Sequence, residues 1–112
     1  MFHQYINEII ENLKGINPFK IILFGSYADG TPTEDSDIDL IVVTNDDIHP
    51  KNYSEKIKIY LVVSQKLSDL MDKVPIDLIV YTRPMYNRFI ELNSMFAKEI
   101  IEKGKTLYEN PN

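Results

Sequence analysis

Two aspartates separated by a single residue, Asp37 and Asp39, are the side chains in this sequence best placed to do chemistry. They fall at the start of a predicted strand, where alternation places both carboxylates on one face and Ile38 and Leu40 on the other. Carboxylates this close repel each other, which is costly unless a cation lies between them. A hard cation such as Mg²⁺, which prefers oxygen ligands and substrate phosphates, would remove this cost. The alternative is a pair of solvated acids at the end of an edge strand.

A glycine and a serine, Gly25 and Ser26, follow directly after another predicted strand. They open a loop rich in Gly, Ser, Thr, Asp and Pro that reaches Ser36. Glycine lets the backbone approach a ligand closely. Ser26 is predicted to cap a short helix whose free amide hydrogens would face a phosphate group. Taken alone, the pair is also compatible with an ordinary turn between a strand and a helix.

A third carboxylate, Asp77, lies near the start of a further predicted strand and shares a face with Ile79 and Tyr81. On its own it is compatible with a strand-end acid exposed to water. If this strand lies beside that of Asp37 and Asp39, the three carboxylates converge on a pocket suited to two metal ions about 3.5–4 Å apart. Sequence spacing leaves the neighbours of each strand open.

The strands that carry these residues are predicted from short apolar runs bounded by turn residues. They cover residues 19–24, 37–44 and 76–82. An amphipathic helix is predicted over residues 2–13, where apolar side chains recur at spacings of three and four. Gly15 follows this helix as a stop.

A long helix is predicted between the second and third strands. Its apolar residues run from Ile57, Tyr60 and Leu61 as far as Val74. Ser54 is predicted to cap it, and the proline at position 75 to end it. The β-branched stretch at 59–63 is less typical of a helix.

Two further helices and a strand are predicted after the third strand. Pro84 is predicted as the first residue of one helix, because proline suits that position. Asn93 or Ser94 is predicted to cap the next helix, which Gly104 ends. A short edge strand is predicted at residues 106–108.

The composition excludes several classes of protein. The 112 residues fit one domain, here 1–112, and at 44% hydrophobic content they can form a core. The chain contains no cysteine, which excludes disulfides and thiolate zinc sites. No apolar run is long enough to span a membrane, so a cytoplasmic protein is expected. A formal charge of −5 and a pI near 4.9 argue against direct nucleic-acid binding.

The joint pattern of these motifs resembles a known family. The G-S-x10-D-x-D pattern from Gly25 to Asp39, followed by Asp77 on a later strand, is similar to the minimal nucleotidyltransferases (MNT) of the DNA polymerase β superfamily. The resemblance covers nearly the whole chain, from the first helix to about Tyr108. It implies a small α/β fold in which a mixed sheet of three to four strands packs against helices.

The resemblance also implies a role for each site residue. Gly25 and Ser26 would hold the triphosphate of ATP, and Asp37 and Asp39 would bind Mg²⁺, with two ions expected. Asp77 would be the third acid, binding metal and helping to deprotonate the attacking hydroxyl. The implied reaction is attack of a substrate hydroxyl on the α-phosphorus of a nucleoside triphosphate, with pyrophosphate leaving.

One position departs from the family pattern. Members often carry arginine in the turn after the G-S pair, whereas this chain has Asp29 there. An anion replaces a phosphate-binding cation, which lowers the expected nucleotide affinity unless another cation compensates. Arg83 and Lys105 are the candidates for that cation.

Short members of this family resemble antitoxins that are paired with helical HEPN-type toxins. The resemblance implies that the chain transfers AMP from ATP to a tyrosine of a HEPN-domain protein encoded nearby, and so acts as an antitoxin. Two alternatives stay open: an antitoxin that neutralises by binding alone, and a nucleotidyltransferase for small molecules such as aminoglycosides. A dimer or a hetero-oligomer is compatible with the sequence.

Overall fold

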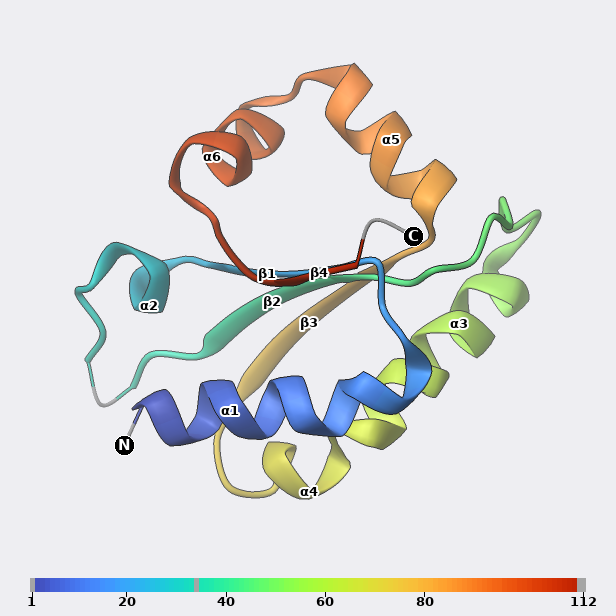
Figure 1. The fold of residues 1–112 in the computed structure, drawn as a ribbon. Coiled ribbons are helices and arrows are strands. Elements are labelled where there is room, and N and C mark those ends of the chain that lie inside the picture. The colour runs from blue at the N-terminus through green and yellow to red at the C-terminus, as the bar shows by residue number, and fades with distance from the viewer. Residues whose placement is uncertain (1, 34, 111–112) are drawn as a thin grey trace.

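Four strands form one mixed sheet in the computed structural model (Figure 1). The structure describes residues 2–33 and 35–110, with side chains from Gln4 onward. The strands are β1 (Lys20–Phe24), β2 (Ile38–Val43), β3 (Ile76–Tyr81) and β4 (Lys105–Glu109). Their order in the sheet is β3-β2-β1-β4, with β1 antiparallel to β2 and β4, and β2 parallel to β3. The mixed α/β fold and the edge strand predicted near residue 106 are both confirmed.

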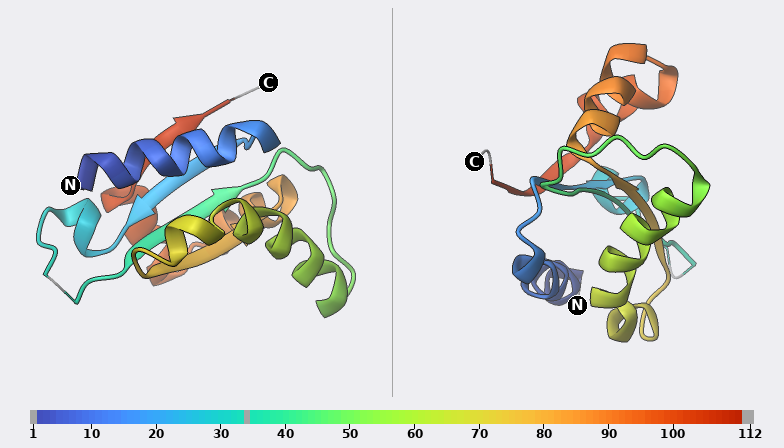
Figure 2. Two further views of the ribbon diagram at one scale, coloured as in Figure 1. Left: turned by 90° about the horizontal axis from the view of Figure 1, so that it is seen from below. Right: turned by 90° about the vertical axis from the view of Figure 1, so that its right-hand side faces the viewer.

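Helices cover both faces of the sheet (Figures 1 and 2). One face carries α1 (Phe2–Leu13), α3 (Tyr53–Lys66) and α4 (Ser68–Met71), and the other carries α5 (Arg83–Leu92) and α6 (Met95–Lys103). A short 3₁₀ turn, Lys14–Ile16, continues α1, and α2 (Ser26–Asp29) lies where β1 ends. Within the described residues, no helix has the length and apolar character to cross a membrane.

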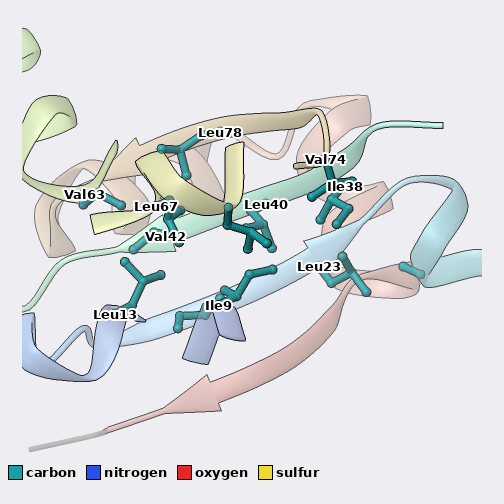
Figure 3. Close-up of a cluster of buried hydrophobic side chains, with 13 residues drawn as sticks. Ile9, Leu13, Leu23, Ile38, Leu40, Val42, Val63, Leu67, Val74 and Leu78 are labelled. Atoms are coloured by element: carbon teal, nitrogen blue, oxygen red, sulfur yellow. The ribbon is translucent and has the colours of Figure 1, made fainter. Parts of the chain in front are cut away.

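Two apolar clusters hold these layers together. The first lies between the sheet and α1, α3 and α4 (Figure 3), and its fully buried members include Ile9, Leu13, Leu40, Val42, Val63 and Leu67. The second lies under α5 and α6, where Ile41, Val43 and Ile100 are surrounded by aromatic rings. Because β2 is buried on both faces, its second half has the continuous apolar run seen in the sequence.

The start of α3 differs from the prediction. The helix begins at Tyr53, and Asn52 caps it, because the Asn52 Oδ1 atom accepts a hydrogen bond of 3.0 Å from the Glu55 amide. Ser54, predicted as the cap, lies inside the first turn. That prediction was wrong because asparagine caps as well as serine and stands two residues earlier.

The long helix predicted up to Pro75 is two helices, separated at Leu67. At this junction the hydroxyl of Ser64 donates to the Leu61 carbonyl at 3.4 Å, and that of Ser68 donates to the Gln65 carbonyl at 3.1 Å. Such bonds compete with the helical pattern and favour a break. The helical region was predicted to end at Pro75. It ends at Met71 instead, and a turn at residues 72–74 separates α4 from the proline.

The two halves of α3 have different surroundings. Val63 in the second half and Leu67 directly after the helix are fully buried against the sheet. Ile57, Tyr60 and Leu61 in the first half are 38%, 39% and 43% exposed. The apolar residues therefore mark the helix as predicted, but the first half extends past the sheet and keeps them in solvent.

The caps of the last two helices are shifted slightly from the prediction. Arg83 is the first residue of α5, Pro84 the second, and Thr82 is the cap. Ser94 caps α6 through a side-chain bond, whereas Asn93 ends α5 in the left-handed conformation at φ 52°. Asparagine tolerates that conformation better than most residues, so the two neighbours divide the tasks of stopping one helix and starting the next.

Candidate active site

The parallel pairing of β2 and β3 brings two of the predicted site residues together. Asp39 lies directly opposite Asp77 in the register of the two strands. Both share their strand face with residues packed under α5 and α6, namely Ile41 and Ile79. Neighbouring strands are about 4.8 Å apart, so the two carboxylates start from adjacent backbone positions on one face. The strands of Asp39 and Asp77 are thus neighbours, the arrangement on which convergence depends.

Asp37 lies just before β2 and is the third acid beside Asp39 and Asp77. The amide of the next residue, Ile38, donates a hydrogen bond of 2.9 Å to the Pro75 carbonyl, which fixes the entry of the chain into the sheet. Asp37 and Asp77 are exposed, whereas Asp39 between them is half-buried. The three acids therefore form a group with a sheltered centre and two solvated flanks.

The central carboxylate is electrostatically perturbed. Burial, followed by the negative charges of Asp77 and Asp37, raises the pKa of Asp39 above its ordinary value of 3.8. All three causes act in the same direction, because each disfavours a charged carboxylate at this position. A cation bound here would reverse the penalty.

Asp39→Asn is expected to stabilise the metal-free protein at neutral pH. Because the folded pKa of Asp39 is raised, the stability that this group contributes is lost as the pH rises through that value. Below the unfolded pKa the side chain is protonated in both states, so the variant and the wild type should be nearly equal. The gain should not exceed about 1 kcal/mol, because a partly exposed charge is screened.

Thermal unfolding between pH 3 and pH 8 in EDTA measures this difference. A variant that is less stable than the wild type at pH 7 would show that Asp39 is favourably paired in the free protein.

Gly25 joins the turn after β1 to this row of acids. Its neighbour Phe24 pairs with Asp39 in the antiparallel register of β1 and β2. At φ 75° and ψ −156°, Gly25 occupies a region that residues with a Cβ atom rarely adopt. A Cβ atom placed there would also overlap Oδ2 of Asp39. The backbone can therefore approach the central carboxylate only because this residue is glycine.

Ser26 is the first residue of α2 and is not its cap. The N-cap position belongs to Gly25, whose carbonyl accepts bonds of 3.0 Å from the amides of Ala28 and Asp29. No side chain caps this helix. The prediction that the Ser26 hydroxyl caps α2 was wrong, because the helix starts one residue earlier than a serine cap requires. Ser26 is half-buried beside the turn that contacts Asp39.

The cations proposed to replace the missing arginine do not lie over the acids. Arg83 follows the far end of β3, where its guanidinium is 4.7 Å from the centre of the Phe19 ring and donates to Asn45 at 3.4 Å. Lys105 pairs with Leu23, whose side chain faces the α1 cluster on the opposite side of the sheet. Neither placement could be predicted from the sequence, because spacing along the chain does not give the direction of a strand or the face of the sheet on which a side chain lies.

An aromatic pair that the sequence analysis did not single out borders the acids. Phe24 shares the face of Asp39, and the Phe96 ring of α6 meets it edge-on with centroids 5.4 Å apart. The position of Phe24 directly before Gly25 was the only feature of the sequence that could have indicated this contact. This contact holds α6 beside the carboxylates.

The donors fit a hard cation, although they are not preassembled. Carboxylate oxygens are the ligands that Mg²⁺ prefers. Burial, and after it the charges of Asp77 and Asp37, raises the pKa of Asp39, so a cation would favour its charged form. Among the described residues, no three acidic or histidine side chains already form a metal-holding group. Asp37 and Asp77 are exposed and can rotate, so a metal would gather these carboxylates around Asp39.

Comparison with known proteins gives independent evidence for the family of this chain. The family model described as nucleotidyltransferase domain matches residues 4–108. A relative from Methanocaldococcus jannaschii, named as a protein adenylyltransferase, is 31% identical over 94% of this chain and 92% of its own length.

Solved structures share the fold. A chain in the crystal structure of a toxin–antitoxin with AMP-PNP is 26% identical, with a TM-score of 0.59 over 94% of this chain and 73% of that chain. A chain in the complex of an MNT antitoxin with the tri-AMPylated HEPN toxin of Shewanella oneidensis is 23% identical. Its TM-score is 0.55 over 98% of this chain and 74% of that chain.

Proposed function

The chain belongs to the nucleotidyltransferase domain family, and on that premise we propose that it transfers AMP from ATP to a hydroxyl group of a protein. The observation that carries this proposal is the register of β2 and β3, in which Asp39 and Asp77 face the same side at the same level. The turn at Gly25 lies against the same carboxylate. A phosphate-binding turn beside acidic metal ligands is the arrangement that phosphoryl transfer needs.

We assign the turn after β1 to binding of the nucleotide and the three acids to binding of the metal. The turn of Gly25 and Ser26 would hold the triphosphate. Because residue 25 is glycine, the backbone of this turn lies directly beside Asp39, where the metal would meet the phosphates. Asp37, Asp39 and Asp77 would hold Mg²⁺, with two ions accommodated. When bound, the metal would polarise the phosphoryl oxygens and neutralise the leaving group.

In the transfer step, the acceptor oxygen forms a bond to the α-phosphorus. The bond from that phosphorus to the oxygen that bridges to the β-phosphate breaks, and pyrophosphate leaves with the electron pair. Asp77, which is exposed at the start of the edge strand, would accept the proton of the attacking hydroxyl. The half-buried Asp39 would hold the cation at the centre of the site.

The acceptor that fits best is a tyrosine of a HEPN-type toxin, so that transfer of AMP silences the toxin. The Methanocaldococcus relative is named as an adenylyltransferase of proteins, and the toxin–antitoxin neighbour was crystallised with an ATP analogue. The HEPN class comes from the resemblance of the G-S-x10-D-x-D motif. Complex formation with this acceptor would make the protein part of a hetero-oligomer.

A second candidate function is neutralisation of the toxin by binding alone. Asp29 favours it, because an anion follows the phosphate-binding turn. Neither candidate cation compensates for it, since Arg83 lies at the other end of the sheet from the acids and Lys105 lies on the opposite face. The three neighbouring acids favour catalysis, since a binding protein has no need for Asp77 and Asp37 beside a carboxylate whose pKa burial already raises.

Incubation with ATP labelled at the α-phosphate, Mg²⁺ and the HEPN-domain protein encoded by the neighbouring gene tests the choice. We expect label on the HEPN protein, and we expect EDTA to reduce transfer to background, because the three carboxylates repel each other without a cation. ATP labelled at the γ-phosphate should leave the acceptor unlabelled. Tight binding of the HEPN protein without transfer would establish the second candidate instead.

A further inference from the structure

Three adjoining hollows surround Lys56 at the end of β3 that lies away from the acids. Their volumes are about 550, 360 and 290 Å³. The first is bordered by α3, by Val80 and Tyr81 of β3 and by Met85 of α5, and the second continues from Tyr81 and Met85 to Phe89. Together they form one groove, called here the β3-edge groove, which is lined by residues of α3 and α5. Figure 1 shows these two helices near the same end of β3.

The sheet is open along this groove. β3 is an edge strand and, in the described part of the chain, pairs with β2 alone. The carbonyl of Tyr81 accepts a bond of 2.8 Å from Thr44 on the β2 side, so alternation directs the backbone polar groups of Leu78 and Val80 outward. An open edge of this kind accepts an extended segment of another chain.

The walls of the groove are apolar side chains left in solvent. Tyr53 is 76% exposed, and Ile57, Tyr60 and Leu61 follow it along the half of α3 that extends past the sheet. Leu92, 62% exposed, stands at the other end of the groove. Contiguous apolar surface bounded by polar groups is characteristic of protein–protein contact sites.

The charged residues that line the groove are basic, although the whole chain has a formal charge of −5. They are Lys51, Lys56, Arg88 and, when protonated, His49. Among the described residues, no aspartate or glutamate lines any of the three hollows. Arg88 is paired with Glu91 at 3.7 Å outside the groove, which leaves Lys51 and Lys56 as its main charges. An acidic partner is therefore complementary to it.

The groove and Asp77 lie along the same strand, β3. Tyr81 is four residues after Asp77, which corresponds to about 13 Å along β3. A protein segment lying in the groove would be held within one strand length of the carboxylate that faces the attacking hydroxyl.

We propose that the β3-edge groove docks an acidic segment with apolar side chains that belongs to the acceptor protein, and so delivers the acceptor hydroxyl to Asp77. This inference rests on the proposed function. A second copy of this chain suits the groove less well, because two identical basic rims would face each other across a twofold axis.

The test uses the purified chain and the purified HEPN-domain protein encoded by the neighbouring gene. The groove variant is Lys51→Glu with Lys56→Glu, and the control is Lys58→Glu with Lys66→Glu. Both variants change the net charge by −4 at exposed lysines, and the control lysines line none of the three hollows. Calorimetry gives the Kd, and labelled ATP gives kcat and KM for the acceptor.

The groove variant should weaken binding about tenfold or more, and raise the KM for the acceptor similarly, while kcat at saturating acceptor stays near the wild-type value. The control should behave as the wild type, and backbone amides of β3 should exchange with deuterium more slowly in the complex. Equal effects of both variants, a fall in kcat alone, or no binding of the HEPN protein to the wild type would overturn the proposal.

The two proposals can fail separately. Binding that depends on Lys51 and Lys56 without transfer of label would remove the transferase function and leave the docking site. Transfer of label that is indifferent to both lysines would do the reverse. Self-association that the groove variant abolishes, with binding of the HEPN protein unchanged, would assign the groove to a second copy of the chain and overturn the docking proposal.

Discussion

Replacement of Asp39 by asparagine should lower kcat/KM for AMP transfer about a thousandfold. Asp39 is the half-buried centre of the acids, directly opposite Asp77 in the sheet and in contact with the turn at Gly25. Asparagine keeps the size of the side chain and removes the charge that would hold a cation between the acids and the triphosphate. Loss of one preorganised electrostatic group in an active site costs about 10²–10³ in rate, and loss of the metal that it holds adds to this.

Asp35→Asn is the matched control, because Asp35 is an exposed acid in the loop that leads to β2. It should retain wild-type transfer. The thermal stability of the Asp39 variant separates chemistry from folding, since that variant is expected to be at least as stable as the wild type at neutral pH. A variant of Asp39 with nearly full transfer at saturating Mg²⁺ would contradict the proposed role.

Replacement of Gly25 by alanine should impair both folding and transfer. The alanine would have to adopt a φ of 75° with ψ −156°, which costs about 1–3 kcal/mol of stability. Its Cβ atom would overlap the Asp39 carboxylate, which must then move. A displacement of about 1 Å at a reacting group costs on the order of a hundredfold in rate, so transfer should fall by at least that factor in the folded fraction.

Gly30→Ala separates the two effects. Gly30 also has a positive φ, of 78°, but a Cβ atom there would meet nothing within 4 Å. This control should lose some stability, as expected for alanine in the left-handed region, and keep its transfer rate. Urea unfolding and single-turnover transfer measure the two quantities. Equal loss of transfer in both variants would mean that contact with Asp39 is not what Gly25 contributes.

Much of the fold was predictable because local patterns decide it. The alternation around Asp37 and Asp39 and the apolar runs of β1 and β3 identified the strands, and the helix over residues 2–13 has the predicted bounds. The wrong predictions mainly concern helix ends, because several nearby residues can cap the same helix, as Asn52 and Ser54 can for α3. The exposure of Ile57 was also missed, because an apolar spacing does not state what lies opposite it.

The sequence by itself determined the family, through the G-S-x10-D-x-D spacing that the nucleotidyltransferase match over residues 4–108 confirms. Alternation within one strand also predicted that Asp37 and Asp39 share a face. In the structure Asp39 lies in β2 and Asp37 lies just before it. The roles of these acids in metal binding and catalysis stay a prediction.

Only the tertiary structure decided that Asp77 lies opposite Asp39, that Gly25 touches that carboxylate, and that Arg83 lies at the other end of the sheet. Each of these depends on strand order, direction and register. Those are set by the packing of the whole core against α1, α3, α5 and α6, and no segment read alone contains that information.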